Sequence, residues 1–327
     1  MGELFNIEKM KKSISKAKRR STWKTVLISM IVIVVVLFSS ILANGFITPL
    51  LASPVQNAFY QYNQVKGANE FIGVEEFYPG ILGGENYYKK YKQVGDRIIY
   101  SGEGGYGYGL FRDEVLGRIG SRSTGFTVQM DKKPSYNELG QRMMTFFYPQ
   151  LNYDVVNNDL LLLNEIANDK LVEMALSFDK GYTSSEAMAL IPKDITKTWL
   201  WVNHIEQGGK LYSINYDENQ NPLGKLPLTL NGQDAYGFSV INTDGTFADQ
   251  PAERFISAID SGAKFNSYWQ QEFQNLKENI AGEDDKLSVS DLVINGIVVT
   301  GTAESLKQLQ DLPFIKASSL GVVVDKY

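Results

Sequence analysis

The sequence has 327 residues, no cysteine and a single histidine, His204. Without cysteine there can be no disulfide bond, thiolate metal site, iron–sulfur cluster or cysteine nucleophile. One histidine excludes metal sites built from several histidines, and a histidine-based triad would have to use this residue. No nucleophile can be paired with a base from the sequence. We therefore predict a protein that is not an enzyme, with no catalytic residues, no metal site and no cofactor.

The chain as a whole has no excess of positive charge, since its net charge is −5. Residues 1–24 are the exception, because they contain eight lysines and arginines against two glutamates, a net charge of +6. The remaining 303 residues therefore sum to −11. An acidic body disfavours nucleic acid as a partner, and the asymmetry predicts a short basic tail attached to an acidic domain.

Charged residues of either sign are absent from residues 25–65. Within this run, residues 25–43 consist mainly of isoleucine, valine and leucine. A helix needs roughly 20 apolar residues to cross the hydrocarbon core of a bilayer, where the backbone must pair its own hydrogen-bonding groups. Trp23 lies at the edge of the block, where indole rings favour the membrane interface. These features predict a transmembrane helix over residues 25–45, with the lipid bilayer as a partner.

A cleaved signal peptide is the alternative interpretation of this block. The apolar part of a signal peptide usually has about 7–15 residues and precedes a cleavage site made of small residues. Here the block is longer, and residues 41–43 and 50–52 place isoleucine or leucine where small side chains are needed. We therefore predict an anchor that stays in the cell membrane as a single span.

Basic residues flank the predicted span on its N-terminal side. Positive flanks stay in the cytoplasm. We therefore expect residues 1–24 to form a cytoplasmic tail and the C-terminal domain to be extracytoplasmic. The membrane-flanking basic residues are Lys16, Lys18, Arg19, Arg20 and Lys24.

Apolar residues in the tail recur at spacings of three and four, which places them on one face of a basic helix. The tail is too short to form a hydrophobic core of its own. One interpretation is a docking helix for a cytoplasmic partner. The other is a helix that lies on anionic lipid or serves only as a topology signal. The candidate partner-binding residues are Leu4, Ile7, Met10 and Ile14.

The rest of the chain divides into two expected parts, residues 46–165 and residues 166–327. Asn44-Gly45, Pro49 and Pro54 predict the end of the anchor helix and the start of a linker. The first part is rich in tyrosine, glycine and phenylalanine, which favours a small β-rich module. Its predicted short strands are residues 97–100, 110–111 and 125–130.

The second part alternates strands with helices. Residues 172–178 alternate apolar and polar side chains, the period of a half-buried strand, and residues 196–205 are apolar on both faces, as in an interior strand. Apolar residues spaced by three and four over residues 265–280 predict a helix with an aromatic face. Together the patterns predict an α+β fold. Its expected parts are an N-terminal transmembrane helix, a β-rich module and a mostly antiparallel sheet covered by helices.

Several motifs suggest ligand chemistry, and each has a plainer explanation. Residues 102–107 match the pattern G-x-G-x-x-G, but their surroundings alternate like a strand, so we predict a glycine-rich hairpin. Residues 217–221 resemble the start of a calcium loop that lacks its glycine and its final glutamate, which predicts a polar turn. The acidic residues 283–285 predict a solvated turn. His204 ends a predicted strand and is interpreted as structural.

Several segments resemble the bacterial sigma factor regulator family in their order and spacing. The basic entry to the anchor, residues 16–24, and residues 91–96 resemble the family's N-terminal region. The segments that resemble the join to its C-terminal domain are residues 147–154, 171–180 and 198–202. The segments that resemble its last third are residues 255–259 and 295–302.

This resemblance implies a single-pass membrane protein of Gram-positive bacteria that takes part in signal transduction and transcription regulation. Members similar to this chain include anti-sigma factors, which hold an extracytoplasmic-function sigma factor at the membrane until envelope stress releases it. The implied partner is such a sigma factor or another membrane regulator, and the family has no catalytic residues to carry over. The alternative hypothesis is an envelope binding or assembly protein without a transcriptional role, whose tail is only an anchor.

Overall fold

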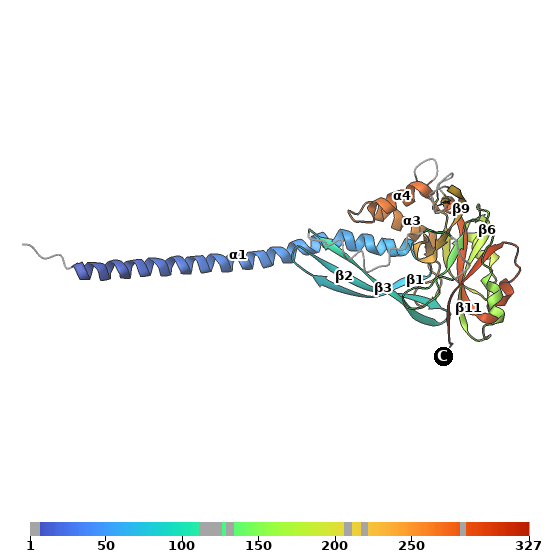
Figure 1. Cartoon of the computed structure of the whole chain (residues 1–327), viewed down its shortest axis with the longest axis horizontal. Helices are drawn as coiled ribbons and strands as arrows, with labels where there is room; N and C mark the ends of the chain where they lie inside the picture. The colour runs from blue at the N-terminus through green and yellow to red at the C-terminus, as the bar shows by residue number, and fades with distance from the viewer. Residues whose placement is uncertain are drawn as a thin grey trace, which may run out of the picture.

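The computed structural model describes residues 7–110, 126–128, 134–205, 211–216, 222–281 and 286–326. Figure 1 shows one long helix that projects from a body of sheets and shorter helices. The structure is 38% helical and 35% strand, and its paired strands are antiparallel. The predicted α+β class with a mostly antiparallel sheet is therefore confirmed.

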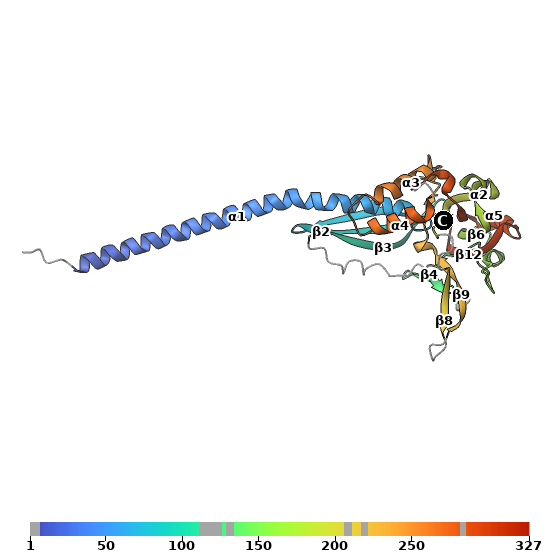
Figure 2. The ribbon, with the colours of Figure 1, turned by 90° about the horizontal axis from the view of Figure 1, so that it is seen from above.

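Helix α1 (Ile7–Val65) has 59 residues. At 1.5 Å per residue it is roughly 90 Å long. The prediction that Asn44-Gly45, Pro49 and Pro54 end the helix is wrong, because both prolines lie inside α1. The turns that follow pack against a sheet, and this packing outweighs the local helix-breaking signals. Figure 2 shows α1 changing direction where it reaches that sheet, as prolines inside a helix favour.

A three-stranded sheet follows α1 in the chain. Its strands, in spatial order, are β1 (Glu70–Pro79), β2 (Gly83–Val94) and β3 (Arg97–Gly109). The prediction of a glycine-rich hairpin between two short strands is wrong, because the glycine-rich segment pairs with β2 as the second half of β3. A Cβ atom on Gly104 would lie 2.6 Å from the ring of Tyr88 on β2. Glycine is therefore used here to make room for an aromatic ring on the neighbouring strand.

A five-stranded antiparallel sheet forms the centre of the C-terminal half. Its strands, in spatial order, are β10 (Gly237–Ser239), β7 (Thr196–Val202), β11 (Ile294–Thr302), β6 (Leu171–Tyr182) and β12 (Ile315–Val324). β7 is the interior strand that its apolar sequence predicts. The alternation in β6 predicts a half-buried strand, but residues 171–178 are all buried. Both faces of this sheet are therefore covered.

Helices cover one face of the five-stranded sheet. They are α2 (Ser184–Leu190), α3 (Pro251–Gly262), α4 (Gln270–Ile280) and α5 (Ala303–Leu306), with the 3-10 turns η2 (Asp159–Asn164), η4 (Val289–Asp291) and η5 (Lys307–Leu309). A further 3-10 turn, η3 (Gly232–Asp234), lies near Ala68 and Met144. The helix predicted over residues 265–280 begins five residues later than expected, at Gln270. The last turn of α1 belongs to the same layer, since Val65 is fully buried in the core that these helices share with the sheet.

A second, smaller sheet lies on the other face. Its strands are β4 (Phe126–Val128), β9 (Pro222–Asn231) and β5 (Thr145–Phe147), and β8 (Tyr212–Tyr216) also pairs with β9. The ring of Phe146 on β5 packs against Trp199 and Trp201 of β7, with ring centroids 6.0 and 4.9 Å apart. This second layer explains why β6 is buried on both faces.

Candidate functional site

The N-terminal part of α1 carries the predicted partner-binding residues. Met10 and Ile14 are exposed and lie one turn apart on the helix. Ile7 is the first residue of α1, and Leu4 lies outside the described residues. The structure therefore presents Met10 and Ile14 on an open helix surface.

The membrane-flanking basic residues lie on the same stretch of α1, and all five are exposed. The residues that line one shallow depression there are Lys16, Arg19, Arg20, Trp23 and Lys24. Their spacings of three and four place them on one face of the helix. Lys18 is exposed outside this depression. The concentrated positive charge suits an acidic protein partner or anionic lipid headgroups.

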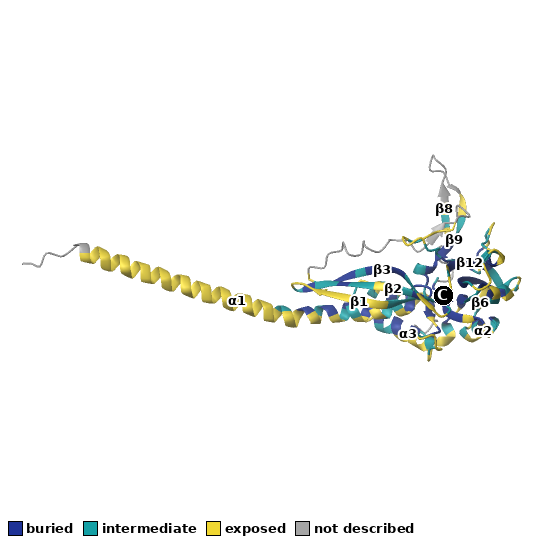
Figure 3. Cartoon of the chain, turned by 90° about the horizontal axis from the view of Figure 1, so that it is seen from below, coloured by how far each residue is buried: buried dark blue, intermediate teal, exposed yellow. Residues whose placement is uncertain are grey.

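The next part of α1 is the predicted membrane span. In the part of the chain that the structure describes, α1 is the one helix long and apolar enough to cross a membrane. Every residue from Lys9 to Ala43 is exposed, which Figure 3 shows as a continuous exposed segment. A long uncovered apolar surface is unfavourable in water but stable in lipid. The structure therefore supports the predicted single-pass anchor.

Beyond the span, α1 rests against the three-stranded sheet. Ala52, Val55 and Phe59 are buried on this face of the helix. The ring centroid of Phe59 lies 4.5 Å from that of Tyr106 on β3 and 4.6 Å from that of Tyr88 on β2. Each aromatic pair of this kind contributes about 0.5–1.5 kcal/mol beyond its buried area. The helix and the sheet therefore form one packed unit.

A cluster of polar side chains ties the end of α1 to the C-terminal half. Glu272 of α4 is its centre, because Oε1 accepts hydrogen bonds from Lys66 Nζ at 3.0 Å, from the Tyr62 hydroxyl at 3.1 Å and from the Tyr236 hydroxyl. Lys66 Nζ also donates to the Tyr62 hydroxyl at 2.7 Å. The His204 ring packs edge-on against Tyr236, with centroids 4.8 Å apart. We call these five residues the junction cluster.

Burial sets the protonation of the two tyrosines and the histidine in the junction cluster. Burial, followed by the nearby Glu272 carboxylate, raises the pKa of both Tyr62 and Tyr236, so both hydroxyls stay protonated. Burial lowers the pKa of His204 to about 4, so its imidazole is neutral near pH 7. Among the described residues, the buried Nδ1 atom of His204 has no hydrogen-bond partner. These contacts agree with the interpretation of His204 as a structural residue.

A buried ion pair joins the three-stranded sheet to the five-stranded sheet. Lys92 of β2 contacts Glu173 of β6, with Nζ and Oε2 3.1 Å apart. Asn69 donates to the other carboxylate oxygen at 2.8 Å, and the Val322 N–H donates to Oε2 at 3.3 Å. Removing one partner of such a buried pair typically costs about 3–5 kcal/mol, because the other charge is left uncompensated. This contact therefore holds the two sheets in a fixed relation.

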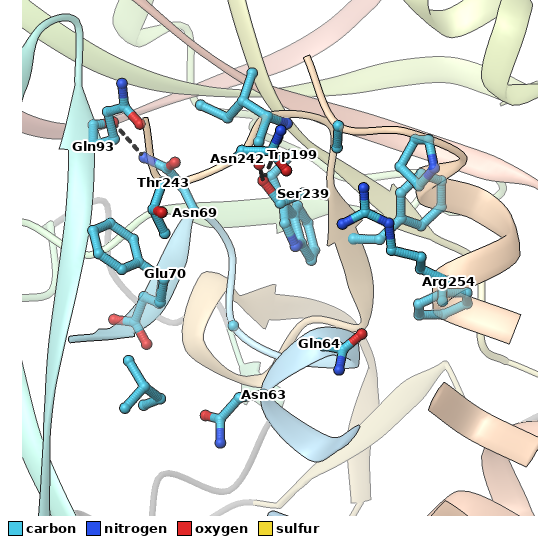
Figure 4. Close-up of a pocket in the computed structure, with 18 of the residues that line it drawn as sticks. Asn63, Gln64, Asn69, Glu70, Gln93, Trp199, Ser239, Asn242, Thr243 and Arg254 are labelled. Atoms are coloured by element: carbon cyan, nitrogen blue, oxygen red, sulfur yellow. Dashed lines mark hydrogen bonds between the residues drawn. The ribbon is translucent and has the colours of Figure 1, made fainter. Parts of the chain in front are cut away.

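A cavity of about 420 Å³ lies where α1, β1 and the edge of the five-stranded sheet meet. Figure 4 shows Asn63 and Gln64 of α1, Glu70 of β1 and Arg254 of α3 around it. Its apolar lining includes Phe71, Trp199, Phe238, Ile241 and Phe255. A lining of this mixed kind suits a ligand that carries both polar and apolar groups.

Glu70 brings a negative charge to the wall of this cavity. Burial alone would raise the pKa of Glu70, but the ammonium groups of Lys90 and Lys92 and hydrogen bonds from Lys90 and Ser101 hold it below its usual value. Lys90 Nζ lies 3.1 Å from Oε2 of Glu70, and the Ser101 hydroxyl donates to Oε1 at 3.1 Å. Arg254 is exposed and adds a positive charge to the lining. The cavity therefore contains one group of each sign.

Residues 163–322 match the sigma factor regulator C-terminal family. This C-terminal part of the chain belongs to the sigma factor regulator family. Comparisons with curated proteins and with solved structures gave no match. The sigma factor regulator family is regulatory rather than catalytic. Among the described residues, no group of three or more histidine, aspartate or glutamate side chains is placed to hold a metal ion.

The sigma factor regulator C-terminal domain begins within η2 and ends within β12, so it contains all of the five-stranded sheet except the end of β12, together with helices α2 to α5. Glu173 and Glu272 lie inside this domain, whereas their partners Lys92 and Lys66 lie before it. Both polar contacts therefore connect the sigma factor regulator domain to the segment that carries the membrane helix.

Sequence patterns single out His204 but not Glu173 or Glu272. One signal points to Lys66, which is the first charged residue after 41 uncharged positions. Glu173 occupies a polar position in an alternating strand, so the sequence pattern predicts that it faces solvent. Its burial follows only from its pairing with Lys92. The predicted polar turns at residues 217–221 and 283–285 lie outside the described residues.

Proposed function

We propose that this sigma factor regulator is a single-pass membrane protein whose extracytoplasmic domain controls an extracytoplasmic-function sigma factor held by its cytoplasmic tail. The observation that carries the proposal is the continuity of α1 from Ile7 to Val65. One helix carries exposed Met10 and Ile14 near one end and buried Val65 at the other. A displacement at the junction cluster therefore reaches the tail without a flexible linker in between.

The orientation of the protein rests on charge. Basic residues directly precede the span, and positive flanks remain in the cytoplasm. The first charged residue after the span, Lys66, is paired with Glu272 of the folded domain at 3.0 Å. The acidic part of the chain then lies on the outer side, where envelope stress in a Gram-positive cell would reach it.

The sigma-binding surface is the apolar stripe that includes Met10 and Ile14. α1 has no break between Ile7 and the span, so the tail projects along the helix axis and does not turn to lie along the bilayer. An amphipathic helix presented in this way binds a hydrophobic groove of a partner protein. The basic face of the tail supports the same contact if the groove has an acidic rim.

Control requires two states of the domain that position α1 differently. The cavity and the junction cluster are the proposed place of this difference, because both contact the last turns of α1. A ligand in the cavity would touch Asn63 and Gln64 of α1 together with Arg254 of the C-terminal domain. Such a ligand would favour one position of the helix over the other.

Co-purification of the full-length protein from its native membrane tests this function. A sigma factor should be recovered with the wild-type protein. The double variant Met10→Asp and Ile14→Asp should lower recovery by about tenfold or more, since a loss of about 1.4 kcal/mol changes affinity tenfold. The control is Ser15→Asp, which adds one negative charge on another face of the exposed helix and should leave recovery nearly unchanged.

Unchanged recovery with the double variant would contradict the proposed sigma-binding surface. Unchanged sigma-dependent transcription in a deletion strain would contradict the regulatory role as a whole. The alternative, an envelope binding or assembly protein, predicts that replacing residues 1–45 with an unrelated anchor leaves function intact. Loss of function after this replacement would argue against the alternative.

A further inference from the structure

The turn between β1 and β2 is attached to α1 at the end of its exposed apolar segment. Asn44 Nδ2 donates to the Gly80 carbonyl at 3.0 Å, and Asn44 Oδ1 accepts from the Leu82 N–H at 2.6 Å. The Leu110 N–H, just after β3, donates to the Leu82 carbonyl at 2.9 Å. Figure 1 shows this end of the three-stranded sheet beside α1. The sheet therefore ends at the level of Asn44.

The position of Asn44 along α1 sets the height of this turn relative to the bilayer. Residues 25–44 of a helix span about 30 Å, which is the thickness of the hydrocarbon core. The basic residues before Thr25 hold the other end of the span at the opposite interface. Asn44 therefore lies where the hydrocarbon core meets the headgroup layer, and the turn of the sheet lies there with it.

Large apolar side chains are exposed at this height. Ile81 in the turn is 78% exposed, and Leu110 is 64% exposed. Phe46 and Leu50 of α1 are each 74% exposed and lie one turn apart. Phe77 and Tyr78 of β1 are also exposed. We call these six residues the apolar rim.

The apolar rim lies in segments without charge. Residues 77–84 and 104–110 contain no charged residue, and neither does α1 from residue 25 to its end. The first charged residues along the β1–β2 hairpin are Glu76 and Glu85, on either side of the turn. Exposed aromatic and aliphatic groups without charge are typical of protein surfaces at a membrane interface. The same surface facing water would be an unusually large exposed apolar patch.

We propose that the apolar rim is a second membrane-binding site, which inserts into the interfacial layer of the leaflet from which α1 emerges. The occupant is the lipid bilayer, because α1 itself carries the rim to the lipid surface. A single transmembrane helix leaves its domain free to tilt relative to the bilayer surface. A second contact with lipid beside the helix restricts this tilting, and it does so whether or not the protein binds a sigma factor.

The lack of cysteine allows a direct test, because one introduced cysteine carries the only thiol-reactive label. Full-length Ile81→Cys is labelled with an environment-sensitive fluorophore and reconstituted at low protein density in vesicles of phosphatidylcholine and phosphatidylglycerol. Lipid that carries a nitroxide near its headgroup should quench this label strongly. Leu110→Cys, labelled in the same way, should be quenched to a similar extent.

Phe247→Cys is the matched control for exposure, since Phe247 is 73% exposed. Phe247 pairs with Ile241, which lines the cavity together with Gln64 of α1. Gln64 lies about 30 Å further along the helix than Asn44, so the label at Phe247 should be quenched much less than the label at position 81. Equal quenching at positions 81 and 247, or no quenching at positions 81 and 110, would overturn the proposal. A spectral shift at position 81 that appears only at high protein density, without quenching, indicates contact between copies of the chain and would overturn it as well.

Discussion

The two ends of α1 use one helical backbone in two different surroundings. Every residue from Lys9 to Ala43 is exposed, whereas Ala52, Val55 and Phe59 are buried against the three-stranded sheet. The first part is apolar on all sides in its span because lipid surrounds it. The second part buries one face because protein covers that face only. One uncharged run of residues therefore encodes two kinds of burial, and only its C-terminal end packs against the folded domain.

The largest expected effect on the free energy of unfolding comes from making the same substitution, phenylalanine to alanine, in the two parts of α1. Phe59→Ala removes a buried ring that contacts Tyr88 and Tyr106, and should lower the free energy of unfolding by about 3–5 kcal/mol. Phe38→Ala removes an exposed ring and should change it by less than about 0.5 kcal/mol. Denaturant unfolding of the full-length protein in detergent micelles, followed by near-UV circular dichroism, measures both. Equal losses would show that the two parts of α1 do not differ as described.

The next effect concerns the stability of the junction cluster as a function of pH. The pKa of His204 is about 4 in the folded protein and 6.5 ordinarily, so between these values the unfolded chain binds a proton that the folded chain does not. Stability from this residue is therefore complete above pH 6.5 and falls as the pH drops toward 4, by at most about 3 kcal/mol. Unfolding free energies at pH 7.5 and pH 5.5 measure the slope.

His204→Gln is the control for this pH dependence, because glutamine does not titrate. The variant should lose most of the difference in stability between pH 7.5 and pH 5.5, while aspartate and glutamate contribute equally to both proteins. A variant that keeps the full slope would assign it to groups other than His204. The groups that face His204 are Tyr236, Lys66 and Glu272.

The smallest effect tests how α1 is held at its end. Glu272→Gln removes the charge that pairs with Lys66, and both side chains are partly exposed. The expected loss is therefore only about 1 kcal/mol. Lys66→Met should cost a similar amount, and the double variant should cost less than the sum of the two. Strictly additive losses in this double-mutant cycle would show that the two residues are not coupled.

The membrane span could be predicted from the sequence because the bilayer acts on local composition alone. The end of α1 could not be predicted from the sequence. Pro49 and Pro54 are local signals, whereas the contacts that override them come from residues far away along the chain. Asn44 bonds to the turn of a hairpin at Gly80 and Leu82, which are 36 and 38 positions away. A pattern read along the chain does not contain these contacts.

The candidate site could not be predicted from the sequence for the same reason. Lys66 and Glu272 are 206 positions apart, and Lys92 and Glu173 are 81 apart. Charged residues with such separations have no common motif, so only the fold brings them together. The glycine-rich strand is a further example, since Gly104 takes its role from the Tyr88 ring on a neighbouring strand.

Pro49 and Pro54 give α1 a soft point close to the lipid surface. Proline has no N–H, so the carbonyls of Gly45 and Leu50 lose their partners within the helix, and bending there requires less energy than elsewhere. When the bilayer undulates, tilting of the span is taken up by bending at this place, whereas a shift along the helix axis or a rotation about it still passes through the unbroken helix to the tail. The contacts of Phe59 with the three-stranded sheet therefore stay in place when the span tilts.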